Sequence, residues 1–244
     1  MRLTSFTAAL SASVVLTLAL PVLANARNVT AFGPNLIVNG DAENGLGSSD
    51  GSNVSVPDWT TSSNFTAVAY GSSDYLPANS PGPTDRGSNF FAGGPSNASS
   101  SATQTISLAS DSAGINTGTT QFNLSGWFGG YSSQDDYASL TATFYNSRGD
   151  ALDSMNIGGI SAADRNGVSG LSYRETSDFV PIGATSVGMS LNMTRLNGSY
   201  NDGYADNLSF SVSSVSAVPE PETYAMLLAG LGLMGFMSRR RQNS

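Results

Sequence analysis

A strict alternation of apolar and polar side chains constrains the fold of this chain more than any other feature. In Thr185–Thr194, every second residue is valine, methionine or leucine, and small or polar residues lie between them. Gln121–Phe128 alternates in the same way, with Phe122 and Phe128 on one face and Trp127 on the other. Because successive side chains of a β-strand point to opposite faces, both segments predict strands with one buried and one solvated face.

Strand-like segments recur along the body of the chain, separated by turn-rich stretches such as Asn44–Asn53. No amphipathic helix of useful length is expected between Arg27 and Val218. Roughly nine strands in one domain of this size predict an all-β fold with two packed sheets. The further expected strands are Asn35–Asn39, Phe65–Tyr70, Asn89–Ala92, Ala102–Leu108, Ser139–Tyr145, Tyr173–Val180 and Tyr204–Val212.

The first residues of the chain have the pattern of a secretory signal peptide. Arg2 precedes an apolar run that continues through Val14–Leu20 to Leu23, and small residues at Ala24 and Ala26 form a cleavage site. A retained N-terminal membrane helix is the alternative, but the cleavage site follows directly after the run. We expect cleavage after Ala26, or else after Ala24, and export of the mature protein.

The last residues form a three-part tail. Pro219, Glu220 and Pro221 give a short extended spacer, because proline fixes φ and prevents a helix from running backward into the body. The run Tyr224–Met237 carries no charge and would be helical in lipid. Three consecutive arginines then hold the C-terminus on the cytoplasmic side of the membrane. This membrane stop consists of Arg239, Arg240 and Arg241.

The order of these three parts resembles the PEP-CTERM sorting signal of Gram-negative bacteria. In that family an exosortase recognises the Pro-Glu-Pro motif at the membrane and cuts the tail, and the protein moves on to the cell surface or extracellular matrix. An ordinary C-terminal membrane anchor is the alternative. A permanent span needs roughly 20 apolar residues, and the shorter run found here favours a processed tail.

The residue types that are missing exclude several classes of site. The chain has no cysteine and no histidine, and all 10 basic residues are arginine. Disulfides, a Ser-His-Asp triad, a histidine general base and zinc sites of the usual kind are therefore excluded. Schiff-base chemistry and phosphate loops built around a lysine are excluded as well.

The body of the chain is acidic. Residues 27–217 contain 6 arginines against 16 aspartates and glutamates, which gives a net charge of −10. Such a surface repels nucleic acid and anionic lipid. It suits neutral partners and hard cations such as calcium.

Four short motifs bracket the mature body: Asn35–Glu43, Val56–Thr60, Val180–Thr185 and Gly203–Phe210. The first two are similar to the opening strand of the galactose-binding-like jelly rolls and the step that follows it. The other two are similar to the steps of the last two strands of that superfamily, which includes many carbohydrate-binding modules. The resemblance implies a single jelly-roll β-sandwich.

In that superfamily a calcium ion commonly joins the first strand to the last. The matching residues here are Glu43 and Asp206, helped by backbone carbonyls of Pro83–Ser88. By strand parity, Asp206 shares a face with Leu208 and Phe210, which predicts an inward carboxylate that needs a partner or a metal. The alternative is that Asp206 caps a turn and Glu43 is solvated. A bound calcium ion would be structural.

Carbohydrate binding would need an exposed aromatic platform with polar partners. The candidates are Trp127, on the polar face of its strand, with Tyr131, Asp135 and Tyr137 in and after the following loop. The alternative is that Trp127 packs beneath that loop and the tyrosines cover a sheet edge. Trp59 belongs to a structural motif and is expected in the core.

Paired carboxylates for glycoside hydrolysis could be sought in Asp135 and Asp136, or in Asp202 and Asp206. Neighbouring aspartates on an exposed loop are more typical of a solvated acidic turn. We therefore assign no catalytic residue.

These features divide the chain into a signal peptide (residues 1–26), a β-sandwich domain (27–217) and a sorting signal (218–244). We expect a non-enzymatic protein that a Gram-negative bacterium exports, through an inner-membrane intermediate, to its cell surface or matrix. Its role would be structural or adhesive and linked to exopolysaccharide or biofilm. The alternatives are a carbohydrate-binding module around Trp127 and a glycan hydrolase.

Overall fold

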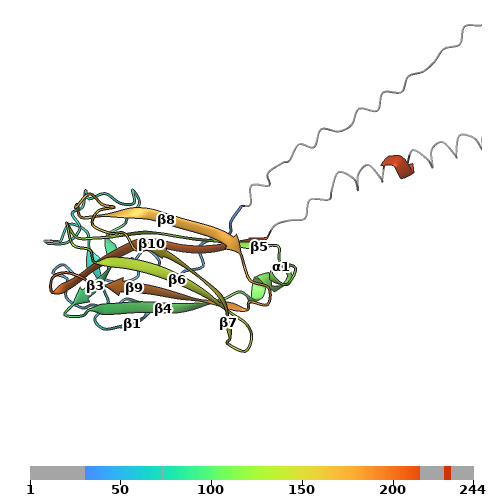
Figure 1. The fold of residues 1–244 in the computed structure, drawn as a ribbon, viewed down its shortest axis with the longest axis horizontal. Coiled ribbons are helices and arrows are strands. Elements are labelled where there is room, and N and C mark those ends of the chain that lie inside the picture. The colour runs from blue at the N-terminus through green and yellow to red at the C-terminus, as the bar shows by residue number, and fades with distance from the viewer. Residues whose placement is uncertain (1–30, 73, 215–227, 232–244) are drawn as a thin grey trace, which may run out of the picture.

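The computed structural model describes residues 31–72, 74–214 and 228–231. The body consists of two five-stranded antiparallel sheets that pack face to face (Figure 1). One sheet has the order β1-β4-β9-β6-β7, and the other has the order β2-β3-β10-β5-β8. Without β1 and β2 this is the strand order of a jelly roll, so the expected fold class is confirmed. The strands are β1 (Thr60–Ser62), β2 (Thr66–Ala69), β3 (Asn89–Pro95), β4 (Ser99–Ser107), β5 (Thr120–Gly130), β6 (Tyr137–Tyr145), β7 (Ala151–Gly158), β8 (Gly170–Phe179), β9 (Ser186–Thr194) and β10 (Tyr200–Ser214).

The alternating segments form strands as predicted. Strand β9 alternates between buried apolar and half-buried polar residues along its whole length. From β5, Phe122 packs between the sheets against Phe144 and Phe210, with ring centroids 5.0 and 5.8 Å away. Trp59 is buried as expected, and its ring meets Phe91 edge-on. The main core therefore follows from the side-chain pattern.

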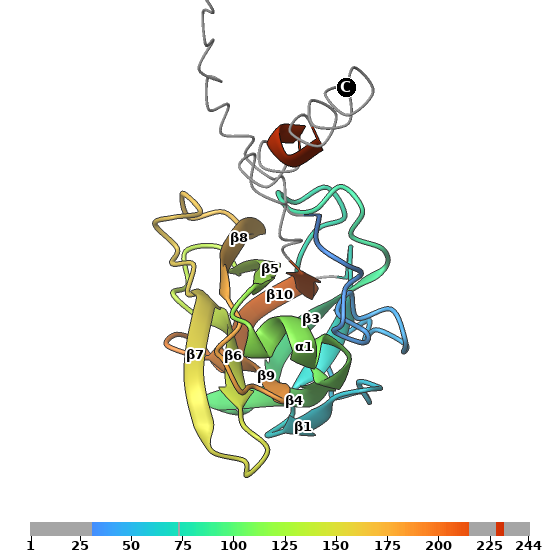
Figure 2. The ribbon, with the colours of Figure 1, turned by 90° about the vertical axis from the view of Figure 1, so that its right-hand side faces the viewer.

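A short helical segment closes one end of the sandwich (Figure 2). It joins β4 to β5 and consists of a 3₁₀ turn, Ala109–Asp111, and helix α1, Ser112–Asn116. Ile115 of α1 is fully buried in the main core. Its five residues agree with the expectation that the body contains no long amphipathic helix.

The expected strand Asn35–Asn39 is wrong. The Asn35 side chain donates to the Leu208 carbonyl oxygen at 2.9 Å and accepts the Phe210 N–H at 3.0 Å. Only isolated backbone bonds accompany these contacts, such as the one from the Leu36 N–H to the Phe210 carbonyl oxygen at 2.7 Å. Asn39 then has a φ of 51°, outside the strand region, while the Gly40 carbonyl oxygen accepts the Leu208 N–H of β10 at 2.8 Å. The segment runs beside β10 without forming a ladder.

The side-chain pattern does not predict β7. Its only buried residue is Ile157, and most of its other side chains are exposed. The strand forms because its backbone pairs with β6, from Ser139 opposite Gly158 to Tyr145 opposite Ala151. An exposed edge strand of this kind shows little alternation of apolar and polar residues in its sequence.

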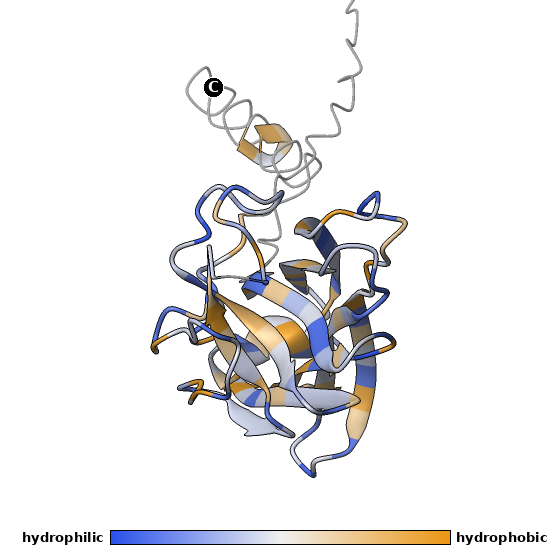
Figure 3. Cartoon of the chain, turned by 90° about the vertical axis from the view of Figure 1, so that its left-hand side faces the viewer, coloured by the Kyte–Doolittle hydropathy of each residue, from blue (hydrophilic) through white to orange (hydrophobic). Residues whose placement is uncertain are grey.

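The second sheet is covered on both faces around β3. Phe91 faces the main core, whereas Phe90 belongs to a second apolar cluster on the outward face, with Val68, Leu76 and Tyr204. The expectation of one solvated face per sheet is therefore wrong for β3. Its run of consecutive apolar residues, Phe90 to Ala92, is typical of a strand that is buried on both faces. Elsewhere, hydrophobic residues gather along the strands and most rim loops are hydrophilic (Figure 3).

Candidate functional site

Trp127 lies half-buried on the outward face of β5, beside Tyr173 of the edge strand β8. The two residues are cross-strand partners, and their ring centroids are 5.6 Å apart at an interplanar angle of 56°. Tyr173 is 43% exposed, and its hydroxyl donates to Glu175 Oε2 at 3.0 Å. The aromatic surface around Trp127 thus includes Tyr173, which sequence reasoning missed because the pairing joins segments far apart in the chain.

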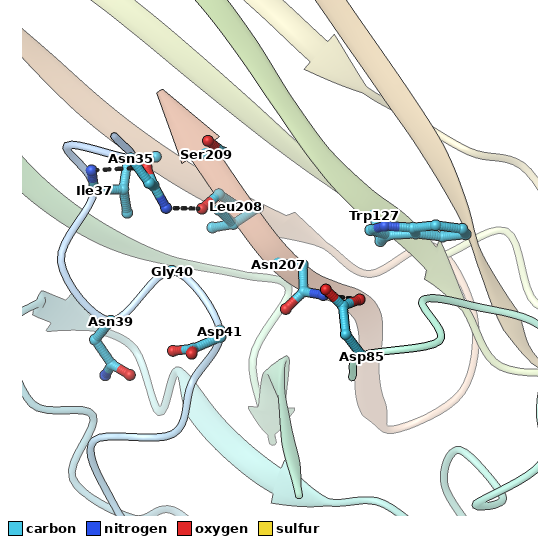
Figure 4. A pocket seen from close by; sticks show the side chains of 10 residues that line it. All are labelled: Asn35, Ile37, Asn39, Gly40, Asp41, Asp85, Trp127, Asn207, Leu208 and Ser209. Atoms are coloured by element: carbon cyan, nitrogen blue, oxygen red, sulfur yellow. Dashed lines mark hydrogen bonds between the residues drawn. The ribbon is translucent and has the colours of Figure 1, made fainter. Parts of the chain in front are cut away.

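An open pocket of about 370 Å³ lies beside Trp127 (Figure 4). Its other walls are the segment 35–41, Asp85, and residues 207–209 of β10. A φ of 48° at Asn207 marks a β-bulge, and the Asn207 amide donates to Asp85 Oδ1 at 2.9 Å. The bulge therefore aims Asn207 at this pocket, as bulges often do beside binding sites.

Asp206 points outward, and the strand-parity prediction that it faces the main core is wrong. It lies opposite Trp127, and Tyr70 donates its hydroxyl to Asp206 Oδ2 at 2.6 Å. The bulge at Asn207 adds one residue to β10, so that Leu208 returns to the main core on the far side of the bulge. Parity counted backward from Leu208 therefore gives the wrong face for Asp206.

The predicted pair Glu43 and Asp206 lies in one electrostatic environment. Asp206 is fully buried, and this burial raises the pKa of its carboxyl to about 8, with a smaller contribution from the charge of Glu43. Glu43 is not simply solvated, because its Oε1 accepts the N–H groups of Ser88 and Asn89, both at 2.8 Å. Glu43 therefore holds the start of β3, whereas Asp206 is held by Tyr70.

This donor set fits a calcium ion only with help from the backbone. Within the part of the chain that the structure describes, no group of three acidic side chains could hold a metal ion by itself. Glu43 and Asp206 would therefore need backbone carbonyl oxygens to complete the 6 to 8 ligands that calcium takes. A buried carboxyl beside a second carboxylate suits a hard cation, because the cation favours the ionised form of both.

The acidic pair after β5 is not a solvated turn. Asp136 is fully buried: its Oδ1 accepts the N–H groups of Leu196 at 2.6 Å and Asn197 at 2.8 Å. Its Oδ2 accepts the N–H of Asp202 at 2.9 Å. Asp135 is exposed and accepts one backbone N–H of the β7–β8 loop at 3.0 Å. Both carboxylates therefore hold loops together.

Tyr131 and Tyr137 lie on different faces of the sandwich. Tyr131 packs against the second apolar cluster, as Trp127 does. Tyr137 begins β6 in the other sheet, and because Ala138 is buried beneath that sheet, the Tyr137 ring lies on its outward face. The chain crosses from one sheet to the other between β5 and β6, so Trp127, Tyr131, Asp135 and Tyr137 do not form one platform.

The outward face of β4, β6 and β9 carries no charged side chain. Thr141 Oγ1 on this face accepts a hydrogen bond at 2.8 Å from the side-chain amide of Asn156, which belongs to the neighbouring strand β7. The Tyr145 ring lies across Gly188, where a Cβ atom would approach a ring carbon to 3.1 Å. We call this surface the hydroxyl face. It consists of Ser99, Ser101, Thr103, Thr105 and Ser107 of β4, Tyr137, Ser139, Thr141, Thr143 and Tyr145 of β6, and Ser186, Gly188, Ser190, Asn192 and Thr194 of β9.

Asp202 and Asp206 have separate hydrogen-bond partners. Asp202 lies at a register shift of β10 on β3, between Asn201 and Tyr204, and Asp206 lies at the start of a second shift, on β5. Asp202 accepts a hydrogen bond from the Tyr204 hydroxyl, and burial raises the pKa of its carboxyl to about 6. Each carboxyl is held by its own tyrosine, Tyr204 for Asp202 and Tyr70 for Asp206.

Residues 217–241 match the model of the PEP-CTERM protein-sorting motif, and the match includes Pro219, Glu220, Pro221 and the terminal arginines. The tail is a PEP-CTERM motif. A chain with a PEP-CTERM motif is a secreted or cell-surface protein that an exosortase processes at the membrane.

Most of the PEP-CTERM motif lies outside the described residues, as does the expected signal peptide at residues 1–26. Of the expected helix Tyr224–Met237, residues 228–231 are helical. Among residues 31–72, 74–214 and 228–231, no helix has the length and hydropathy needed to cross a bilayer.

A search of curated proteins found no match. Similar solved structures include a family 16 carbohydrate-binding module (16% identity, 72% of this chain, 99% of that chain, TM-score 0.43). A cyclase from Fischerella sp. TAU is also similar (14% identity, 77% of this chain, 100% of that chain, TM-score 0.46). So is the enzymatically active domain of bacteriophage CBA120 tailspike protein 4 (18% identity, 74% of this chain, 21% of that chain, TM-score 0.44). This chain thus spans about a fifth of the tailspike chain, and similarity at this level supports no functional argument.

Proposed function

We propose that this protein is exported, trimmed by an exosortase at its PEP-CTERM motif, and retained in exopolysaccharide through its β-sandwich. The host would be a Gram-negative bacterium, and the role would be structural or adhesive in biofilm material. The single observation that supports glycan binding best is the uncharged hydroxyl face.

The hydroxyl face suits a neutral polysaccharide. All 16 acidic residues of the body lie elsewhere, so a neutral polymer meets no desolvated charge on this surface. One hydroxyl–hydroxyl hydrogen bond contributes only about 0.5 to 1.5 kcal/mol. Such contacts repeat along a polymer, and the Tyr137 and Tyr145 rings offer flat apolar surfaces to the C–H faces of sugar rings.

Replacing Ser190 by aspartate should weaken retention by polysaccharide about tenfold. The carboxylate would stand at the centre of the hydroxyl face, opposite Thr141 of β6 and Thr103 of β4. A bound neutral polymer would have to desolvate this charge, at a cost of more than 1 kcal/mol. Affinity electrophoresis in gels that contain xylan, a soluble β-glucan or the native exopolysaccharide measures the effect.

The matched control is Ser177→Asp, which adds the same charge to the outward face of β8 in the other sheet. It should migrate like the wild type, and thermal melts should show that both variants fold. Equal retention of the wild type and Ser190→Asp in every polymer would contradict the role of the hydroxyl face.

Calcium would support this function by joining the loop segment that carries Glu43 to Asp206 of β10. At calcium concentrations about 100-fold above Kd, we expect EDTA to lower the Tm by about 5 to 10 °C. Asp206→Asn should reduce the difference strongly, because the neutral amide oxygen lacks the negative charge that makes the carboxylate the stronger calcium ligand. If wild-type melts with EDTA and with calcium coincide, the calcium proposal is wrong.

A carbohydrate-binding module around Trp127 remains the second candidate. The Trp127–Tyr173 ring pair and the open pocket beside it favour this candidate. If polysaccharide does not bind around Trp127, the proposal for the hydroxyl face still stands, because the two surfaces belong to opposite sheets.

A further inference from the structure

The pocket beside Trp127 has a particular hydrogen-bonding character. Two of its amides are already used by the protein. Asn35 binds the backbone of β10, and Asn39 donates to the Pro57 carbonyl oxygen at 2.8 Å and accepts the Asn44 N–H at 2.9 Å. Both amides therefore shape the wall and leave little capacity for a ligand.

Apart from the Ser209 hydroxyl, which can donate or accept, the polar atoms left in this pocket are mainly acceptors. Asp85 uses Oδ1 to accept from Asn207, which leaves Asp85 Oδ2 and the Asn207 carbonyl oxygen. The Asp41 carboxylate lies at the opposite wall, where it accepts one weak bond, at 3.4 Å, from the N–H of Glu43. A ligand that satisfies these atoms must bring hydrogen-bond donors.

The charge of the pocket narrows the class of ligand. Asp41 and Asp85 line it, no basic side chain does, and the carboxyl of Asp206 lies just behind Asn207. Trp127 supplies an indole ring, whose face attracts cations. Acceptors, negative charge and an indole ring together favour an ammonium group over a neutral or anionic one.

The walls of the pocket are held in place before any ligand arrives. Trp59 donates its indole N–H to the Asn39 carbonyl oxygen at 3.0 Å, which fixes the turn that carries Asp41. The Asn207 bulge is held by its own N–H bond to Asp206 Oδ1 at 2.7 Å. A volume of about 370 Å³ is of the size that holds a small ligand.

We propose that this pocket binds an amino sugar with a free ammonium group, such as a de-N-acetylated glucosamine unit of a polysaccharide. Asp85 and Asp41 would accept hydrogen bonds from the ammonium group, and the sugar ring would stack on Trp127. The ammonium specificity follows from the pocket, and the choice of a sugar as carrier rests on the proposed function.

Tryptophan fluorescence of the purified mature protein tests this proposal, with a glucosamine trimer and its fully N-acetylated form as probes. We expect the glucosamine trimer to quench Trp127 and to bind at least about tenfold more tightly than the N-acetylated trimer. Asp85→Asn should weaken binding about tenfold, and Trp127→Ala should abolish the quenching, since Trp59 is buried. The matched control Asp153→Asn removes an exposed carboxylate of β7 and should change nothing.

The remaining outcomes separate the competing explanations. Equal binding of both trimers would overturn the ammonium specificity, and unchanged binding by Asp85→Asn would overturn the site. The pocket would be a cation site, and the sugar proposal would be wrong, if the protein binds calcium, if Asp85→Asn abolishes this binding, and if the glucosamine trimer does not bind. Ser190→Asp should bind the glucosamine trimer as tightly as the wild type does. The polysaccharide-retention assay therefore tests the hydroxyl face, and the fluorescence assay tests this pocket independently.

Discussion

Replacing Asp136 by asparagine should lower the free energy of unfolding by about 3 to 5 kcal/mol. The Asp136 carboxylate accepts three backbone N–H groups, from Leu196, Asn197 and Asp202, and it has no exposure to solvent. An asparagine would place its NH₂ group against at least one of these donors and would remove the charge that strengthens the others. Urea unfolding at neutral pH should show a lower midpoint with an unchanged slope.

Asp202→Asn is the matched control, since Asp202 is also a buried aspartate in contact with this network. Burial raises the pKa of Asp202 from 3.8 to about 6, so the folded state favours the protonated form. Its contribution to stability is therefore present at low pH and is lost as the pH rises through about 6. Asp202→Asn should be at least as stable as the wild type at neutral pH. Equal destabilisation by both substitutions would contradict the special role of Asp136.

The main core was predictable because its side chains follow the period of the strand. The alternation in Gln121–Phe128 and Thr185–Thr194 placed Phe122 and Leu191 between the sheets, where the structure has them. The tail was predictable for a different reason, since its three parts are contiguous in the chain and need no tertiary contact to be recognised.

The candidate sites were less predictable because they depend on contacts between distant segments. Tyr173 meets Trp127 only through the register of β8 on β5. The direction of Asp206 depends on one bulge residue, Asn207, which the alternation of side chains does not reveal. Asp136 looked like part of a solvated turn, and only the fold brings the β9–β10 loop over it.

Replacing both Glu220 and Pro221 by alanine should abolish processing of the tail almost completely. In the PEP-CTERM motif these residues belong to the short step that the exosortase is expected to recognise. The uncut chain would keep the apolar run Tyr224–Met237 and the arginines after it, and so would stay in the membrane. Glu222→Ala, which removes the neighbouring carboxylate outside the Pro-Glu-Pro step, should be processed like the wild type.

The intact mass of the chain, recovered separately from the cell surface and the membrane of the source bacterium, tests export and trimming most directly. We predict that the surface fraction lacks residues 1–26 and ends near the Pro-Glu-Pro step. The Glu220→Ala/Pro221→Ala chain should instead keep its C-terminus and remain with the membrane. A wild-type chain that is soluble in the cytosol and intact from Met1 to Ser244 would contradict the whole account.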